Sequence, residues 1–294
     1  MKTENLISII GAGPAGISAA IQLKRYGYEP LLFEKDRVGG LLWNANLIEN
    51  YPGFPKGISG PKLIRLMEKQ LINYQINVKY QYIDLIRKGH GYYSLLDGNN
   101  EFLSKYLVIA SGTKPKPIPF TIPEEIADNV HQDIVNLLAI EGKKIVIIGG
   151  GDAAFDYAIN LSKKNKVSII IRGEIQSIPL LVERAINNPA ISVVKNTSLE
   201  EIGTWLSSEI DPGKTIEVKL ISKNRHIVRM ECNELVFALG REPRTEFCGD
   251  ISEDEHCFFV GDVRNGIYRQ ASIAIGDGIM AAMKIHNIIS SGVR

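Results

Sequence analysis

The chain has 294 residues, of which 45% are hydrophobic and 23% are charged, and its net charge at pH 7 is +1. This length is enough for two domains, and the near-neutral charge argues against a nucleic-acid or membrane-surface partner. The apolar stretch over residues 6–23 follows Glu4 and contains glycines and a proline, unlike a basic signal peptide, and no other run approaches a membrane span. Three cysteines argue against a disulfide framework, so we expect a cytoplasmic protein.

A glycine-rich turn follows the first predicted strand. The pattern predicts a strand over residues 6–10, a helix over 15–26 and a strand over 30–33. The turn between the first strand and the helix reads Gly11-Ala12-Gly13-Pro14-Ala15-Gly16. In this arrangement the first glycine makes the turn, the second lets backbone approach a pyrophosphate, and the third permits close helix packing. Glu34, 23 residues after Gly11, is placed to accept hydrogen bonds from ribose hydroxyls, as in FAD.

The middle of the chain predicts a helix over residues 60–74 and strands over 78–86, 92–96 and 106–109. The last strand ends in small residues, which either let backbone pass close to a cofactor or form an ordinary turn: Ala110, Ser111, Gly112 and Thr113. Prolines then alternate with other residues over 114–119. Because proline fixes its own φ and restricts the preceding residue, we expect a semi-rigid crossing into another domain.

The glycine fingerprint recurs 138 positions later. A strand over residues 145–148 ends in Gly149-Gly150-Gly151-Asp152-Ala153-Ala154, and a helix and a strand over 167–171 follow. Arg172 stands 23 residues after Gly149, where the first copy has an acid. A guanidinium there can pair with a ribose 2′-phosphate, so we favour NADPH over NADH; the alternative is a solvated charge at a strand end.

The remaining elements complete two repeats of one architecture. They are strands over residues 191–194, 215–221, 226–231 and 257–260, and a helix over 270–289. We therefore expect an α/β fold of two Rossmann-like, three-layer dinucleotide-binding domains, the second inserted into the first. Residues 1–113 and 247–294 form the expected FAD domain and residues 118–242 the NAD(P) domain, with hinges at 114–117 and 243–246.

These motifs together resemble the low-molecular-weight thioredoxin reductase family over essentially the whole chain. The segments that carry the resemblance, besides the first fingerprint with its acid, are Gly39-Gly40, Glu49-Asn50-Tyr51-Pro52-Gly53, Gly261-Asp262-Val263 and Tyr268-Arg269-Gln270-Ala271. The resemblance implies a homodimer in which Asp262 binds the ribityl-phosphate region of FAD and Gln270 and Ala271 approach the isoalloxazine. Asp262 as a turn or cap residue is the alternative.

The expected cofactor contacts form two sets. The FAD set is Gly11, Gly13, Pro14, Ala15, Gly16, Glu34, Lys35, Gly39, Gly40, Leu41, Leu42, Asn50, Val78, Ala110, Ser111, Gly112, Gly261, Asp262, Arg269, Gln270 and Ala271. The NAD(P) set is Gly149, Gly151, Asp152, Ala153, Ala154, Asp156 and Arg172. The family's His-Arg-Arg run is reduced here to Ile171-Arg172-Gly173, and Ser177 replaces a further arginine, so NADPH selection is weakened.

The largest departure from the family concerns sulfur. Members that reduce thioredoxin carry a Cys-x-x-Cys dithiol shortly before the second fingerprint, where residues 131–136 here read His-Gln-Asp-Ile-Val-Asn. The three cysteines are Cys232, Cys248 and Cys257, and no two are separated by two residues. Thiol-disulfide exchange needs a thiolate and a disulfide partner, so an internal dithiol relay is not expected. The cysteines read as small buried hydrophobes, or Cys248 and Cys257 pair with each other.

The leading hypothesis is an FAD-dependent NAD(P)H oxidoreductase that passes hydride to FAD and electrons on to an external acceptor. The acceptor is ferredoxin, flavodoxin, another small redox partner or a small molecule, and no metal site is expected. His131, Asp133 and Asp156 are candidates for acid–base roles, with a helix cap or surface residue as the alternative for His131 and a helix-dipole acid for Asp156. Other hypotheses are disulfide reduction without an internal dithiol, a ferredoxin-dependent flavoenzyme and a flavin-binding redox sensor.

Overall fold

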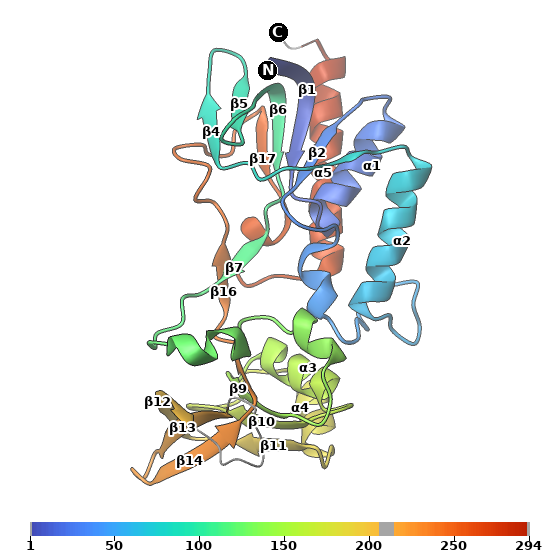
Figure 1. Ribbon diagram of the computed structural model, residues 1–294. Coiled ribbons are helices and arrows are strands. Elements are labelled where there is room, and N and C mark those ends of the chain that lie inside the picture. Colours follow the sequence, from blue (N-terminus) through green and yellow to red (C-terminus); the bar gives the residue numbers. More distant parts are fainter. Residues whose placement is uncertain (1, 206–214, 293–294) are drawn as a thin grey trace. The chain divides into compact units, whose positions relative to one another are not determined.

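The computed structural model describes residues 2–205 and 215–292, and the chain divides into two compact units (Figure 1). Unit 1 comprises Met1–Trp43, Ile48–Lys114 and Arg241–Arg294, and unit 2 comprises Asn44–Leu47 and Pro115–Gly240. Each unit is described by itself below. In the described residues, the helices are too short or too polar to cross a membrane.

Unit 1 is built on a seven-stranded sheet with the order β3-β2-β1-β6-β5-β4, and β17 also pairs with β6. Its strands are β1 (Lys2–Ile10), β2 (Leu31–Glu34), β3 (Val78–Tyr80), β4 (Leu85–Lys88), β5 (Tyr93–Leu96), β6 (Glu101–Ile109) and β17 (Cys257–Phe259). β1 is parallel to both β2 and β6, and β17 is parallel to β6, whereas β4 and β5 pair antiparallel. The carboxyl ends of the parallel strands therefore share one edge, the usual place for ligands in such sheets.

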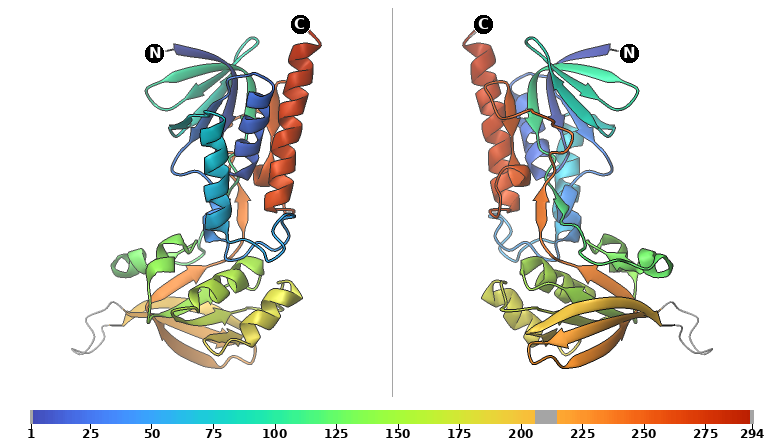
Figure 2. Two further views of the ribbon diagram at one scale, coloured as in Figure 1. Left: turned by 90° about the vertical axis from the view of Figure 1, so that its right-hand side faces the viewer. Right: turned by 90° about the vertical axis from the view of Figure 1, so that its left-hand side faces the viewer.

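Three helices stand side by side along one face of this sheet: α1 (Pro14–Arg25), α2 (Gly60–Asn73) and α5 (Ala271–Ser290) (Figure 2). α1 and α5 pack closely because small residues face each other. A Cβ added at Gly278 would lie 2.1 Å from the carbonyl oxygen of Ala15. The hydroxyl of Ser18 lies 2.9 Å from the carbonyl oxygen of Ala15 and 3.0 Å from that of Ile275. The C-terminal helix thus belongs to the core of unit 1 beside its first helix.

Unit 2 contains a parallel five-stranded sheet with the order β11-β10-β9-β15-β8. Its strands are β8 (Val130–His131), β9 (Lys144–Ile148), β10 (Lys166–Ile170), β11 (Ile191–Val194) and β15 (Glu234–Phe237). Side chains on one face pack with α3 (Asp152–Leu161) and α4 (Pro179–Ile186). Those on the other face pack with an antiparallel sheet of β12 (Thr197–Trp205), β13 (Thr215–Ser222) and β14 (Ile227–Cys232). The expected fold of two Rossmann-like units is confirmed, with helices on one face and a second sheet on the other.

One predicted strand is wrong. Residues 78–86 form two short strands, β3 and β4, that lie at opposite edges of the sheet of unit 1. The backbone turns at Gln81, whose N–H donates to the carbonyl of Lys79 at 2.9 Å. The apolar pattern continues through the turn because Ile83 is buried although it lies outside both strands. A prediction from hydrophobicity alone therefore merged two strands that lie in different parts of the sheet.

The strands β8, β12 and β15 were not expected from the sequence. β15 is short and begins with the charged residue Glu234, although all four of its residues are buried. β12 mixes polar and apolar residues and contains a register shift between Leu199 and Glu201. A bulge moves subsequent side chains to the other face and so interrupts the alternation that marks a strand in a sequence.

The chain passes between the units within two short strands that pair with each other, β7 (Thr113–Pro115) and β16 (Arg241–Pro243). It leaves unit 1 after Lys114, inside the proline-containing hinge at 114–117. It returns at Arg241, two residues before the expected hinge at 243–246. Four further residues, Asn44–Leu47, cluster with unit 2 although they lie early in the chain.

Candidate functional site

The first glycine loop leaves open space at the start of α1. Gly11 has φ +104°, and a Cβ there would lie 2.4 Å from the carbonyl oxygen of Ala110. A Cβ at Gly16 would lie 1.8 Å from the carbonyl oxygen of Gly11, so α1 is pressed against the turn. At Gly13, however, an added Cβ meets nothing within 4 Å. The first turn of α1 carries no acid, so its free N–H groups can receive an anion there.

Glu34 lies at the end of β2 and is fixed by backbone donors. The N–H of Ala12, in the glycine loop, donates to Oε2 at 2.8 Å. The N–H groups of Lys35 and Asp36 donate to Oε1 at 2.9 and 3.1 Å. These bonds orient the carboxylate beside the loop, and its remaining lone pairs can accept further hydrogen bonds, as ribose hydroxyls require.

A second glycine pair lies against the loop. The N–H of Gly39 donates to the carbonyl of Ala12 at 2.8 Å. Gly40 has φ +55°, and its added Cβ would lie 3.6 Å from the Cα of Gly13. The turn at Gly39-Gly40 therefore keeps backbone close to the open position above the start of α1, as expected for a site that binds an extended dinucleotide.

The segment after β6 forms another side of the same region. The N–H of Ala110 donates to the carbonyl of Ile10 at 2.8 Å, which continues the pairing of β6 with β1. The hydroxyl of Ser111 donates to the carbonyl of Arg244 at 2.7 Å. The N–H of Arg244 donates to the carbonyl of Gly112 at 3.1 Å. Residues 110–112 are thus tied both to the central strand and to the returning chain.

The C-terminal segment packs directly on the start of α1. Gly261 has φ +73°, and a Cβ there would lie 2.9 Å from the Cβ of Ala15. Its N–H donates to Oδ2 of Asp277 at 3.0 Å. Asp262 follows in this turn; burial raises the pKa of its carboxyl, against the opposing charge of Arg269. Sequence reasoning missed Asp277, although it is the single acid of the mainly apolar helix α5, which was a signal for it.

The start of α5 is connected to the loop before α2. Gln270 is the N-cap residue of α5, and its Oε1 accepts a hydrogen bond from Nδ2 of Asn50 at 2.9 Å. Ala271 begins the helix, and its first turn contains no acid. This end of α5 therefore presents a positive helix dipole next to two side-chain amides.

The other residues expected to contact FAD also lie in unit 1. Leu41 and Leu42 lie in a single 3₁₀ turn, Gly40–Asn44, and Leu42 and Val78 pack against the core of the unit. Lys35 follows Glu34 directly. The glycine geometry, the oriented carboxylate and the two acid-free helix starts together fit an adenine dinucleotide in this unit.

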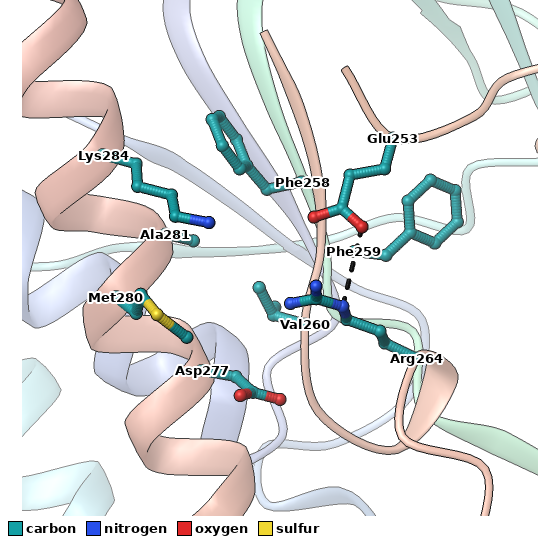
Figure 3. Close-up of a pocket in the computed structure, with 9 residues that line it drawn as sticks. All are labelled: Glu253, Phe258, Phe259, Val260, Arg264, Asp277, Met280, Ala281 and Lys284. Carbon is teal, nitrogen blue, oxygen red and sulfur yellow. Dashed lines mark ion pairs between the residues drawn. The ribbon is translucent and has the colours of Figure 1, made fainter. Parts of the chain in front are cut away.

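A small pocket lies next to this region, between β17 and α5 (Figure 3). Phe258, Met280 and Lys284 line it, and Arg264 forms an ion pair with Glu253 at 3.5 Å. Its lining includes none of the residues expected to bind FAD, and it touches the cofactor region only through Asp277. We assign it no role in the reaction.

The second glycine loop repeats the geometry of the first within unit 2. A Cβ at Gly149, which has φ +150°, would lie 2.5 Å from the carbonyl oxygen of Ala238. A Cβ at Gly150 would lie 2.8 Å from Cγ2 of Ile171, whereas a Cβ at Gly151 meets nothing within 4 Å. Gly151 is the N-cap residue of α3, as Gly13 is of α1. The open position again lies at a helix N-terminus.

Residues after β10 are fastened to this second loop. The N–H of Gln176 donates to the carbonyl of Gly150 at 2.8 Å. The N–H of Ile178 donates to Oδ1 of Asp152 at 2.8 Å, so this first-turn acid of α3 binds protein backbone. Within the first turn of α3, the side chain of Ala154 is fully buried and that of Ala153 is exposed. The glycine loop and the segment that follows β10 therefore form one structure.

Arg172 and Ser177 lie on this segment and differ in environment. Arg172 is exposed at the end of β10, and within residues 2–205 and 215–292 its guanidinium has no hydrogen-bond or ion-pair partner. The hydroxyl oxygen of Ser177 is buried and has no hydrogen-bond partner in the described chain. Within the described residues, the segment after β10 thus carries one cation without an ion-pair partner, Arg172, and one buried hydroxyl without a hydrogen bond, Ser177.

Asp156 is on the second turn of α3 and is partly buried. The N–H of Asn46 donates to its Oδ2 at 2.9 Å, and both residues belong to unit 2. Burial raises the pKa of Asp156 to about 6, although the Asn46 hydrogen bond and the charge of Lys163 oppose the rise. Of the three acid–base candidates, this one has a shifted pKa near neutrality.

His131 and Asp133 lie in the stretch 131–136, in which the resemblance led us to look for a dithiol. Nε2 of His131 is 2.8 Å from Oε2 of Glu234, a buried residue of β15 that sequence reasoning missed. Asp133 is exposed, and its Oδ1 accepts a hydrogen bond from the N–H of Val135 at 3.4 Å. The structure therefore brings His131 together with a carboxylate, and leaves Asp133 at a turn.

The three cysteines are free and buried. Burial raises the pKa of Cys232 to about 12 and that of Cys248 to about 11. Burial also raises the pKa of Cys257. Because the thiolate is the reactive form, these thiols are poor nucleophiles at neutral pH.

Comparisons with known proteins agree with this geometry. The family model for pyridine nucleotide-disulphide oxidoreductase matches residues 6–278. A thioredoxin reductase of Rickettsia typhi is 29% identical over 312 residues, which cover 99% of this chain and 100% of that protein. Two solved structures, thioredoxin reductases of Lactococcus lactis and T. acidophilum, superpose with TM-scores of 0.87 and 0.85. Each is 26% identical and covers 98% of this chain and 99% of its own.

Proposed function

Because the chain belongs to the pyridine nucleotide-disulphide oxidoreductase family, we propose that it oxidises NAD(P)H and passes the electrons through FAD to an external acceptor. The family and the relatives establish the coarser part of this statement, an FAD-dependent oxidoreductase that uses FAD and NADPH. The finer part, an external acceptor in place of an internal dithiol, is our proposal.

One observation carries the choice of an external acceptor: the chain has no pair of cysteines that can work as a dithiol relay. Its three cysteines are at positions 232, 248 and 257, and all three are buried. Their raised pKa values keep them protonated at neutral pH. Electrons that reach the flavin therefore have no protein disulfide of this chain to reduce and must leave directly.

The chain's own residues would supply binding and orientation. When bound, FAD accepts a hydride from the nicotinamide and releases electrons singly or in pairs. In unit 1 the open start of α1 at Gly13 receives the pyrophosphate, and Glu34 holds the adenosine ribose. In unit 2 the start of α3 at Gly151 receives the second pyrophosphate, and Arg172 pairs with a 2′-phosphate.

We propose Asp156 as a proton-exchanging group for the reduction of a two-electron acceptor, because hydride transfer from NAD(P)H itself neither takes up nor releases a proton. Its partly buried carboxyl titrates near pH 6, close enough to neutrality to be populated in both forms. A hydride carries two electrons and one proton, so reduction of a two-electron acceptor takes up one further proton. A one-electron acceptor such as ferredoxin is instead reduced twice for each NAD(P)H and releases the proton.

Anaerobic titration tests the donor and the acceptor separately. We expect NADPH to bleach the visible absorbance of the bound flavin, and ferredoxin, flavodoxin or a small-molecule acceptor to restore it. A variant with all three cysteines replaced by alanine should give the same two results. Bleaching by reduced ferredoxin alone would reverse the direction of electron flow, and no bleaching by any donor would favour a redox sensor.

A second candidate function is reduction of a substrate disulfide directly at the flavin. The relatives with this similarity are named thioredoxin reductases, and that observation favours it. Turnover with a thioredoxin disulfide by the wild-type chain would support this candidate. Loss of that turnover in the cysteine-free variant would assign the transfer to a cysteine and overturn our choice.

We further propose that the protein is a cytoplasmic homodimer that uses α5. The free cysteines fit a reducing compartment. On α5, the side chains of Ile273, Ile279, Met280 and Met283 recur at helical spacing and are 36–47% exposed. An apolar helix face of this kind is typical of an interface. Light scattering should give the dimer mass for wild type and the monomer mass for Met280→Asp, whereas Ile186→Asp on α4 should remain a dimer.

A further inference from the structure

Arg244 is a cation without an ion-pair partner among the residues that the structure describes. It follows β16 and is half-buried. Its guanidinium makes no hydrogen bond or ion pair with any residue that the structure describes. Placing a charged group partly out of water without a partner is unfavourable, so a compensating ligand is expected next to it.

The backbone of Arg244 is held against one side of the first glycine loop. Its N–H donates to the carbonyl of Gly112, and its carbonyl accepts the hydroxyl of Ser111 at 2.7 Å. The preceding residue, Ala110, lies directly over Gly11, where its carbonyl oxygen would be 2.4 Å from an added Cβ. The side chain of Arg244 therefore starts from the strand-end edge where unit 1 binds its ligand.

A second cation shares this neighbourhood. Burial and the nearby charge of Arg244 lower the pKa of Lys35, while the charge of Glu34 opposes this. The N–H of Lys35 donates to Glu34 Oε1, so Lys35 lies at the end of β2 beside the Glu34 carboxylate, and Arg244 is close enough for its charge to act on Lys35. Glu246, two residues after Arg244, forms an ion pair with Lys114 at 3.4 Å, and the charges of Lys114 and Arg244 both lower the pKa of its carboxyl. Within the part of the chain that the structure describes, the guanidinium of Arg244 therefore has a nearby negative charge but no ion pair or hydrogen bond.

We infer that Arg244 binds the adenosine end of FAD. This inference rests on the proposed placement of FAD in unit 1. In this placement the start of α1 binds the pyrophosphate. The guanidinium of Arg244, next to the end of β2, then faces the ribose and adenine. A guanidinium is planar and weakly hydrated, and it binds aromatic faces better than a lysine ammonium does. Arg244 was not among the residues that the glycine fingerprint indicates, because it lies more than 200 positions after that fingerprint.

The test measures flavin binding to the full-length chain after removal of its flavin. Dissociation constants for FAD and for FMN, which lacks the adenosine, are measured by flavin fluorescence for wild type, Arg244→Ala and Arg244→Lys. Arg87→Ala is the matched control, since Arg87 is an exposed arginine on β4, at the far edge of the same sheet. Thermal unfolding of each flavin-free variant checks that the fold is retained.

We expect Arg244→Ala to raise the dissociation constant for FAD about 10-fold and to leave that for FMN unchanged. Arg244→Lys should retain only part of the FAD affinity, and Arg87→Ala should match wild type. Unchanged FAD affinity in Arg244→Ala, or equal losses of affinity for FAD and FMN, would overturn the inference. If the wild-type chain binds FAD in the same experiment, the cofactor site itself is upheld. A wild-type chain that binds neither flavin would overturn the site in unit 1 and this inference with it.

Discussion

Replacing Glu34 by glutamine should weaken FAD binding far more than it weakens the fold. The carboxylate accepts the N–H of Ala12 on one oxygen and those of Lys35 and Asp36 on the other. Glutamine keeps one oxygen acceptor and presents an NH₂ group to the remaining donors. Lys35 and Asp36 are exposed, so water can satisfy their N–H groups once the amide turns its oxygen toward Ala12. The cost to the flavin-free protein is therefore small.

The loss on binding is larger because the ribose hydroxyls need the acceptor that glutamine removes. A hydrogen bond to a charged group contributes about 1.5–3 kcal/mol, which corresponds to a dissociation constant for FAD raised about 10- to 150-fold. Binding of FMN should not change, since FMN has no adenosine ribose. Fluorescence titration of the flavin-free chain measures both constants.

The matched control for this experiment is Glu29→Gln. Glu29 lies in the same unit, and its carboxylate is 83% exposed and 2.7 Å from the ammonium of Lys24. This variant should bind FAD as wild type does. Two results would refute the assignment of Glu34 to the ribose. One is a Glu34→Gln variant that binds FAD as tightly as wild type does. The other is a variant that loses FAD and FMN affinity equally and whose melting temperature falls by many degrees.

Three further predictions follow from the two loops. Gly13→Ala should leave the melting temperature of the flavin-free chain unchanged, because its Cβ enters open space, but it should weaken FAD binding. Gly16→Ala should instead destabilise the fold by about 1–3 kcal/mol in denaturant unfolding, because its Cβ meets the carbonyl of Gly11. Arg172→Ala should raise the KM for NADPH about 10-fold in steady-state kinetics and leave that for NADH unchanged; equal KM values for NADPH in the two proteins would contradict it. The pKa of Asp156 is about 6 in the folded protein and 3.8 in an unfolded chain. The protonated carboxyl therefore stabilises the fold fully below pH 3.8, and this stabilisation is lost as the pH rises through 6. Asp156→Asn should therefore unfold at higher temperature than wild type at pH 8 by calorimetry, with no such gain at pH 4.

The sequence predicted those parts of the fold that depend on local pattern. The helices α1, α2 and α5 begin within one residue of the expected positions, since caps, prolines and apolar spacing lie within each helix. Both glycine loops have the expected open position because the fingerprint is a local backbone requirement. Pairing partners are not local, and for that reason β3 and β4 were joined in one strand although the sheet separates them.

Spacing from a glycine loop predicted the position of Glu34, which accepts the N–H of Ala12 in that loop, while the cofactor roles of Glu34 and Arg172 stay predictions. The site could not be predicted where distant segments meet. Asp277 binds the turn at Gly261, and Glu234 binds His131 from 103 positions away. Neither acid belongs to a motif, and each has its role only because a helix or a strand returns beside the earlier segment.

The segment Asn44–Leu47 shows how such a long-range contact changes chemistry. Its sequence gives no sign that it clusters with residues 115–240, yet Oδ1 of Asn44 accepts the N–H of Ile134 at 2.9 Å and the N–H of Asn46 binds Asp156. The same helix position in a bare α3 would be an ordinary solvated acid near a helix start. Burial raises the pKa of Asp156 to about 6, and the hydrogen bond from this segment opposes the rise by stabilising the ionised form. The raised pKa of Asp156 thus belongs to the fold of unit 2. Because the donor is the backbone N–H of Asn46, Asn46→Pro, which removes it, should raise the pKa of Asp156 further, whereas Asn46→Ala keeps the donor and this hydrogen bond.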